Sequence, residues 1–149
     1  MIRKFMWLNY GVLLIWCGIL SRICYTDIRY RLIKNKDILI LLILVISTLF
    51  ILDKPFNYPC ALITLAIGFI LVTINIVGAG DIKLLAVLAL TFPDGIILGY
   101  LLVMSILGSI LAIIEFIRLR FEKRQSRGLP YGVAIIGSYL FVIYDLFIT

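Results

Sequence analysis

Long apolar segments separated by short polar connections make up most of this chain of 149 residues. Hydrophobic residues are 64% of the sequence, against the roughly 45–50% usual in soluble domains. A helix needs about 20 mostly apolar residues to cross a bilayer. We expect transmembrane helices at Phe5–Tyr25, Ile38–Leu52, Tyr58–Val77, Ile82–Phe92, Ile96–Ile117 and Gly128–Thr149. The sequence therefore predicts an all-α, polytopic membrane protein with about six transmembrane helices and a single domain over residues 1–149.

The segment at Ile82–Phe92 is the shortest of the six. As a helix its eleven residues reach about 16 Å, against a hydrocarbon core of roughly 30 Å. A half crossing that returned to its own side would put the connection at Arg118–Arg127 outside. Five basic residues in that connection oppose this arrangement. We therefore expect six crossings.

Basic residues are concentrated in two connections, with four in Thr26–Asp37 and five in Arg118–Arg127. Positively charged connections stay on the cytoplasmic side of a membrane. The connections at Asp53–Asn57 and Pro93–Gly95 then lie outside. The net charge of +6 is thus a topology signal and does not indicate a nucleic-acid surface. We expect the same topological role for Arg29, Arg31 and Lys34.

The chain has no histidine, and its three cysteines, Cys17, Cys24 and Cys60, contain no C-x-x-C pair. A zinc site with the usual ligands is therefore not expected, and neither is a Ser-His or Cys-His pair. We expect no metal or other cofactor. The cysteines are interpreted as small buried apolar residues.

One acidic residue, Asp81, follows two glycines between apolar segments, in Gly78-Ala79-Gly80-Asp81. A charge there costs several kcal/mol and marks a candidate functional site. The predicted topology places Asp27 at the same membrane face. Two neighbouring carboxyls hold one proton between them, so that one can act as a base on water while the other donates a proton. Alternatively, Asp81 pairs with Lys83 or caps a helix, and Asp27 is an ordinary loop residue.

The other acidic residues are expected elsewhere. We predict Asp53, Asp94 and Asp145 toward the outer side, and Asp37 and Glu122 in solvated loops. Glu115, near the cytoplasmic end of its helix, is expected either to extend toward the membrane interface or to pair with Arg118 or Arg120.

The Gly78–Asp81 stretch with Lys83 resembles the GxGD motif of membrane aspartic proteases, in the form found in type IV prepilin peptidases. The stretch Asp27–Asn35 is similar to the D-x-R-x-x-x-I-P-N element of that family, with Lys34 where proline is usual. Leu129–Gly132 resembles its late proline-aromatic-glycine element. The three elements occur in the family's order and span nearly the whole chain.

The resemblance implies a membrane aspartic endopeptidase whose catalytic residues are Asp27 and Asp81. It also implies a substrate: a prepilin-like precursor with a basic leader and an apolar helix, cut at the cytoplasmic face of the plasma (inner) membrane. We expect Gly78, Gly80 and Lys83 to contact this substrate, since glycines let an extended backbone come close. The chain resembles the small peptidase-only members, because it lacks the paired C-x-x-C elements of the methylation domain.

Two other functions remain open from the sequence. One is a small transporter with Asp81 and Lys83 as its coupling site, although no internal repeat typical of transporters is present. The other is a non-catalytic membrane partner of a pilus or secretion apparatus, in which both aspartates would be dispensable.

Overall fold

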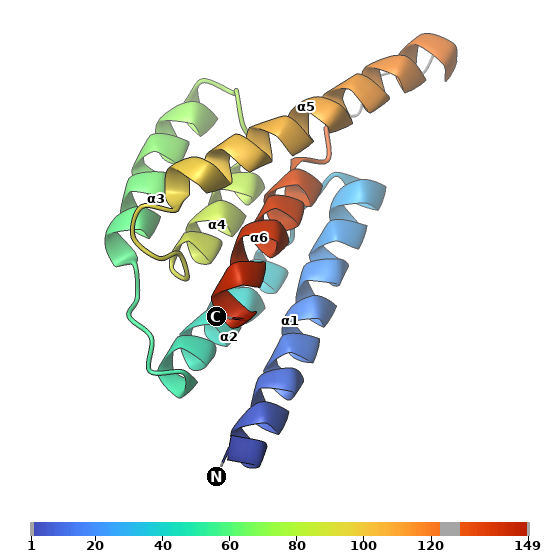
Figure 1. Ribbon diagram of the computed structural model, residues 1–149. Helices are drawn as coiled ribbons and strands as arrows, with labels where there is room; N and C mark the ends of the chain where they lie inside the picture. Colours follow the sequence, from blue (N-terminus) through green and yellow to red (C-terminus); the bar gives the residue numbers. More distant parts are fainter. Residues whose placement is uncertain (1, 123–128, 149) are drawn as a thin grey trace.

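The computed structural model describes residues 2–122 and 129–148, and these ranges contain helices and no strand. The helices follow one another as α1 (Ile2–Tyr30), α2 (Asn35–Ile51), α3 (Tyr58–Thr73), α4 (Ala79–Ala89), α5 (Ile97–Glu122) and α6 (Tyr131–Ile148) (Figure 1). Each predicted apolar segment overlaps one of them. The all-α prediction is therefore confirmed.

The boundaries of two predicted connections were wrong. The polar stretch Thr26–Asp37 is not one long loop, because α1 continues to Tyr30 and α2 already begins at Asn35. Likewise, α5 continues through Arg118 and Arg120 as far as Glu122. Residues 123–128 of that predicted basic connection lie outside the described part of the chain, and so do the side chains of Glu122 and Asp145.

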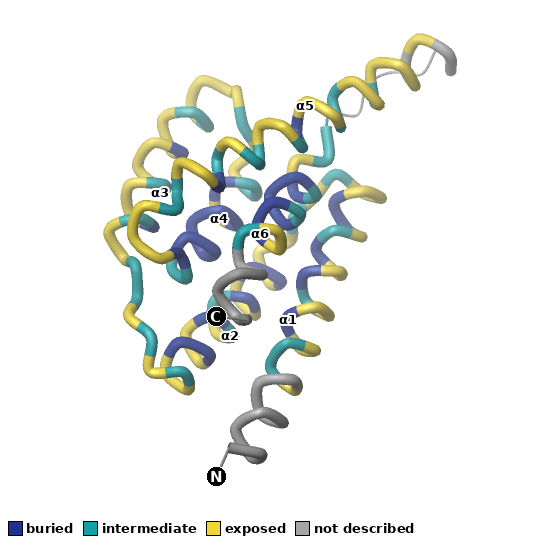
Figure 2. Tube along the Cα trace, viewed as in Figure 1, coloured by how far each residue is buried: buried dark blue, intermediate teal, exposed yellow. Residues whose placement is uncertain are grey.

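The shortest helix, α4, lies in the interior of the bundle. It has 11 residues, of which Ile82 and Leu84–Ala89 are buried. Figure 2 shows α4 mostly in dark blue, whereas α3 and α5 are mostly exposed. The side chain of Ile82 packs directly against Gly68 of α3, in the space that a side chain at position 68 would otherwise fill. Protein neighbours rather than lipid surround α4, so it does not need the length of a spanning helix.

Aromatic side chains connect the helices through the core. Trp16 of α1 donates a hydrogen bond from Nε1 to Oγ1 of Thr48 on α2, at 3.0 Å. Its ring stacks on Tyr139 of α6, with the ring centroids 5.8 Å apart. Tyr100 of α5 donates to the carbonyl oxygen of Ile135 on α6, at 3.0 Å. Each buried polar atom of these side chains has a partner, as burial requires.

The connections between helices gather at two opposite ends of the bundle (Figure 1). At one end, Asn57 before α3 donates from Nδ2 to the carbonyl oxygen of Phe92 after α4, at 2.9 Å. At the other end lie the α1–α2 and α3–α4 connections, together with Leu129 and Pro130 before α6. This second end carries the candidate site.

Two of the described helices are long and apolar enough to cross a membrane, over Gly11–Tyr30 in α1 and Ile97–Arg118 in α5. Shorter apolar stretches occupy Tyr58–Thr73 and Tyr131–Val142. By length and composition, therefore, two crossings are supported among the described residues, and the six that the sequence predicts go beyond this finding.

Candidate active site

Asp27 lies near the end of α1 and is 4% exposed. Its carboxyl faces the backbone N–H groups of Gly132 and Val133 at the start of α6, where the helix dipole is positive. These groups do not form a hydrogen bond with Oδ2, which is buried and has no partner among the described residues. A buried carboxylate oxygen without a partner is unusual in a folded protein. It is therefore available to a water molecule or a substrate.

Asp81 lies in the first turn of α4, three residues after the N-cap residue Gly78. The backbone N–H of Gly78 donates to its carboxyl, as the acidic residue of a capping box does. Asp81 precedes the apolar part of α4 and lies outside the two candidate membrane spans. Burial raises the pKa of Asp81 to about 6, helped by the negative charge of Asp27 and opposed by the N–H of Gly78.

The structure thus brings Asp27 and Asp81 close enough for the charge of one carboxyl to affect the other. Ile33, in the connection between α1 and α2, packs against both α4 and α6. A methyl group on Gly80 would lie 3.1 Å from Cβ of Ile33, and one on Gly132 would lie 3.2 Å from its Cδ1. An added methyl group at either glycine would therefore require Ile33 to shift by a few tenths of an ångström. The two glycines thus let the α1–α2 connection pack against the beginnings of α4 and α6.

The residues predicted to contact substrate are placed at the same end of the bundle. Gly78 lies against the Asp81 carboxyl, because a methyl group there would be 2.9 Å from Oδ2. Gly80 was expected to contact substrate, but in this structure it packs on Ile33. Lys83 is exposed and donates from Nζ to Oδ1 of Asn35, at 3.1 Å. The alternative ion pair between Asp81 and Lys83 does not form among the described residues. The helix-capping alternative, in contrast, agrees with the contact to Gly78.

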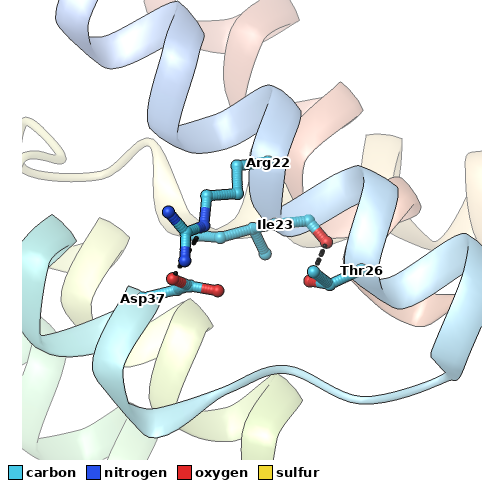
Figure 3. Close-up of polar contacts among 4 residues, drawn as sticks. All are labelled: Arg22, Ile23, Thr26 and Asp37. Atoms are coloured by element: carbon cyan, nitrogen blue, oxygen red, sulfur yellow. Dashed lines mark hydrogen bonds and ion pairs between the residues drawn. The ribbon is translucent and has the colours of Figure 1, made fainter.

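Asp37 was predicted to lie in a solvated loop, and this was wrong. It is 0% exposed, in the first turn of α2. Figure 3 shows Arg22 of α1 reaching its carboxyl, with Nε 3.1 Å from Oδ1. The next turn of α1 is held by its own hydrogen bond, from Oγ1 of Thr26 to the carbonyl oxygen of Ile23 at 3.0 Å. The ion pair joins α1 to α2 one turn before Asp27.

Glu115 was expected either to extend toward the membrane interface or to pair with Arg118 or Arg120, and the structure gives it a different partner. Its Oε1 accepts from Nη2 of Arg31 at 3.1 Å, across 84 positions of sequence. The sequence contained one usable signal for this contact. Glu115 is an acidic residue inside an apolar segment, the same feature that singled out Asp81.

Two coupled carboxyls that share a proton can perform acid–base chemistry without another titratable group. One carboxylate can accept a proton from water while the other, still protonated, donates to a carbonyl oxygen. Among the described residues, no group of three or more acidic, cysteine or histidine side chains could hold a metal ion. The fold and site together define an all-helical protein with a paired carboxyl site at one end.

A model of the type IV leader peptidase family matches residues 12–113, more than half of the chain, from α1 into α5. The chain belongs to this family. It is therefore a peptidase of a membrane-associated family that processes type IV prepilin-like substrates. The match includes Asp27 and Asp81 and ends before α6. No curated protein and no solved structure matches the chain.

Proposed function

We propose that this protein is a membrane aspartic endopeptidase that removes the basic leader from a prepilin-like precursor, with Asp27 and Asp81 as its catalytic residues. One observation carries the proposal. The two carboxyls, 54 positions apart in the sequence, meet at one end of the bundle and interact electrostatically. Family membership supports the peptidase activity and the class of substrate.

The surroundings of the two carboxyls favour different roles. Burial disfavours the charge on both. Asp27, however, faces the amides of Gly132 and Val133 and the positive charge of Arg31, all of which favour its anion. Asp81 has a single backbone N–H, from Gly78, and it also feels the negative charge of Asp27. We therefore assign the shared proton to Asp81 and the role of base to Asp27.

The reaction then proceeds in two proton-transfer steps. Asp27 takes a proton from a water molecule, whose oxygen attacks the carbonyl carbon of the scissile peptide while Asp81 protonates the carbonyl oxygen. The product is a neutral geminal diol. In the second step Asp81 takes back a proton from one diol hydroxyl, the C–N bond breaks, and Asp27 gives its proton to the leaving nitrogen. Both carboxyls return to their starting states, as catalysis requires.

The position of the site supports cleavage at the cytoplasmic face. The connection after α1, which adjoins the site, contains Arg31 and Lys34, and the last part of α5 contains Arg118 and Arg120. Basic residues at the ends of spanning helices favour the cytoplasmic side. Large apolar side chains on α3 and α5, among them Phe69, Ile70, Leu98 and Phe116, are exposed. Such a surface suits contact with lipid and with the apolar helix of a precursor. We propose a single domain in the plasma (inner) membrane and retain six crossings as part of this proposal.

The alternative function as a small transporter has less support. Lys83 is bonded to Asn35 on the exposed surface, so Asp81 and Lys83 do not form the coupled pair that this alternative uses. The non-catalytic alternative is separated from the peptidase by mutation, because it predicts that both aspartates are dispensable.

The test is cleavage of a co-expressed pilin-like precursor in membranes, followed by its change in size. We expect Asp27→Asn and Asp81→Asn each to abolish cleavage at normal protein levels, because an amide cannot exchange the proton. Asp53→Asn is the matched control. Asp53 is exposed, lies after α2 at the other end of the bundle, and has a φ of 50° that asparagine tolerates. Normal cleavage by either of the first two variants would show that the proposed function is wrong.

A further inference from the structure

Arg31 adopts a backbone conformation that arginine rarely takes. Its φ is 52°, in the left-handed region, and its N–H donates to the carbonyl oxygen of Asp27 at 2.8 Å. Glycine or asparagine is the usual residue at such a helix end, since the left-handed backbone conformation brings the Cβ of other residues too close to the following carbonyl oxygen. Strain of this kind persists where the surroundings impose it, often at a functional site. The contacts of the Arg31 side chain supply a reason for this backbone conformation.

The guanidinium of Arg31 is held away from solvent. Nη2 is paired with Glu115 on α5, and the side chains of Arg31 and Glu115 are 20% and 18% exposed. Nη1 is buried and has no hydrogen-bond partner among the described residues. A residue that acted only as a topology determinant would extend this group into water. The structure instead encloses it, although enclosing a charge costs free energy.

The enclosed charge acts on Asp27. Arg31 is a source of positive charge at that carboxyl, alongside the backbone amides of α6. In a site shielded from water, such an interaction is stronger than at the surface. Glu115 fixes the guanidinium at its far side and partly offsets its charge.

We infer that Arg31 is a positioning residue of the peptidase site: held by Glu115, it keeps an enclosed positive charge beside the Asp27 carboxyl and keeps the α1–α2 connection against the site. This inference rests on the proposed function and extends it to a residue pair outside the acidic dyad. Arg31 acts through Asp27 and is not itself a catalytic residue.

The test compares pH profiles of kcat/KM for a purified pilin-like precursor cut by the solubilised full-length protein. The acidic limb reports the ionisation of the base. The groups that face Asp27 are Cys24 on its own helix, Arg31 after it, Asp81 on α4 and the first amides of α6. Glu115 on α5 adjoins it through Arg31.

Removing the positive charge of Arg31 should move the acidic limb of the kcat/KM profile to higher pH. For Arg31→Gln we expect a shift of about one pH unit, and for Arg31→Lys, which keeps the charge, a limb close to that of the original protein. Glu115→Gln should move the limb downward, because the amide still accepts from Arg31 but no longer offsets its charge. The matched control is Arg29→Gln. Arg29 is exposed and bonded to Tyr25, and its replacement should leave the limb in place.

A purely structural role for Arg31 would lower the unfolding temperature and leave the limb unmoved, and that result overturns the inference. An acidic limb that moves to higher pH in both Arg31→Gln and Glu115→Gln would also overturn the inference. Where Arg31→Gln does not insert into membranes, the downward shift in Glu115→Gln decides alone. If Asp27→Asn or Asp81→Asn still cleaves in the same assay, it is the proposed function that fails.

Discussion

A methyl group has no room at Gly132, because it would lie 2.8 Å from Oδ2 and 3.1 Å from Cγ of Asp27. The amino end of α6 is therefore in direct contact with the carboxyl that we assign as the base. This contact sets both the position of the carboxyl and the positive partial charge behind it.

The contact predicts a strong effect of a small substitution. Gly132→Ala should push the Asp27 carboxyl away from α6, and a displacement approaching 1 Å costs on the order of 10²-fold in rate. The measurement is the initial rate of precursor cleavage at matched protein levels. Gly99→Ala on α5 is the control, since a methyl group there meets nothing within 4 Å. Equal rates in the two variants would contradict the assignment of Asp27 to the site.

The pH dependence of cleavage follows from Asp81. Its pKa is raised to about 6, chiefly by burial and then by the charge of Asp27, so Asp81 is mostly protonated below pH 6. As the proton donor it must start in this form. We therefore expect kcat/KM to fall about tenfold per pH unit above pH 6. A kcat/KM profile that keeps rising to pH 8 would contradict the assignment of Asp81 as proton donor and Asp27 as base.

Stability should show the same titration without any substrate. The folded protein holds Asp81 at a pKa above its ordinary value of 3.8, so the favourable contribution of the neutral form is complete below that value and is lost as the pH rises through about 6. Asp81→Asn does not titrate. Its unfolding temperature in detergent should therefore rise relative to the original protein between pH 4 and pH 6, and the difference should then stay constant. A constant difference over the whole range would mean that burial does not affect Asp81.

The ion pair of Arg22 and Asp37 predicts a double-mutant effect. In Arg22→Gln, the buried Asp37 carboxylate loses its charged partner, and we expect a loss of about 1–3 kcal/mol in unfolding free energy. Adding Asp37→Asn should recover most of that loss, because the buried charge is removed as well. Denaturant unfolding measures both variants. Additive losses in the double variant would show that the two side chains do not interact.

The orientation in the membrane can be tested with single cysteines in a chain whose Cys17, Cys24 and Cys60 are replaced by serine. A cysteine at Lys34 should be shielded from an impermeant reagent in whole cells, and one at Asp53 should be labelled. A cysteine at Gln125 should also be shielded, although this position lies outside the described residues. Labelling at Lys34 would place the two carboxyls on the outer side.

The sequence predicted the helices well because apolar segments of helical length leave few alternatives in a membrane protein. It also paired Asp27 with Asp81, through the count of crossings and the family motifs. The boundary after Asp27 was missed, because the left-handed turn at Arg31 carries neither of the residues that usually mark one.

The burial of Asp37 and the partner of Glu115 could not be predicted for a different reason. Both depend on which helices lie side by side, and the charges flanking Asp37, Lys36 among them, give the local appearance of a solvated loop. The Arg31–Glu115 pair joins positions 84 residues apart, a separation that leaves no periodic trace in a single sequence.

The amides that face Asp27 are synthesised long after Asp27 itself. Asp27 and Asp81 are made early, but the amides that face Asp27 belong to Gly132 and Val133, near the end of these 149 residues. A nascent chain that still lacks α6 holds both carboxyls without the helix end behind Asp27. On the proposed assignment, the amides that favour the Asp27 anion reach this carboxyl only after α6 has been made and has packed.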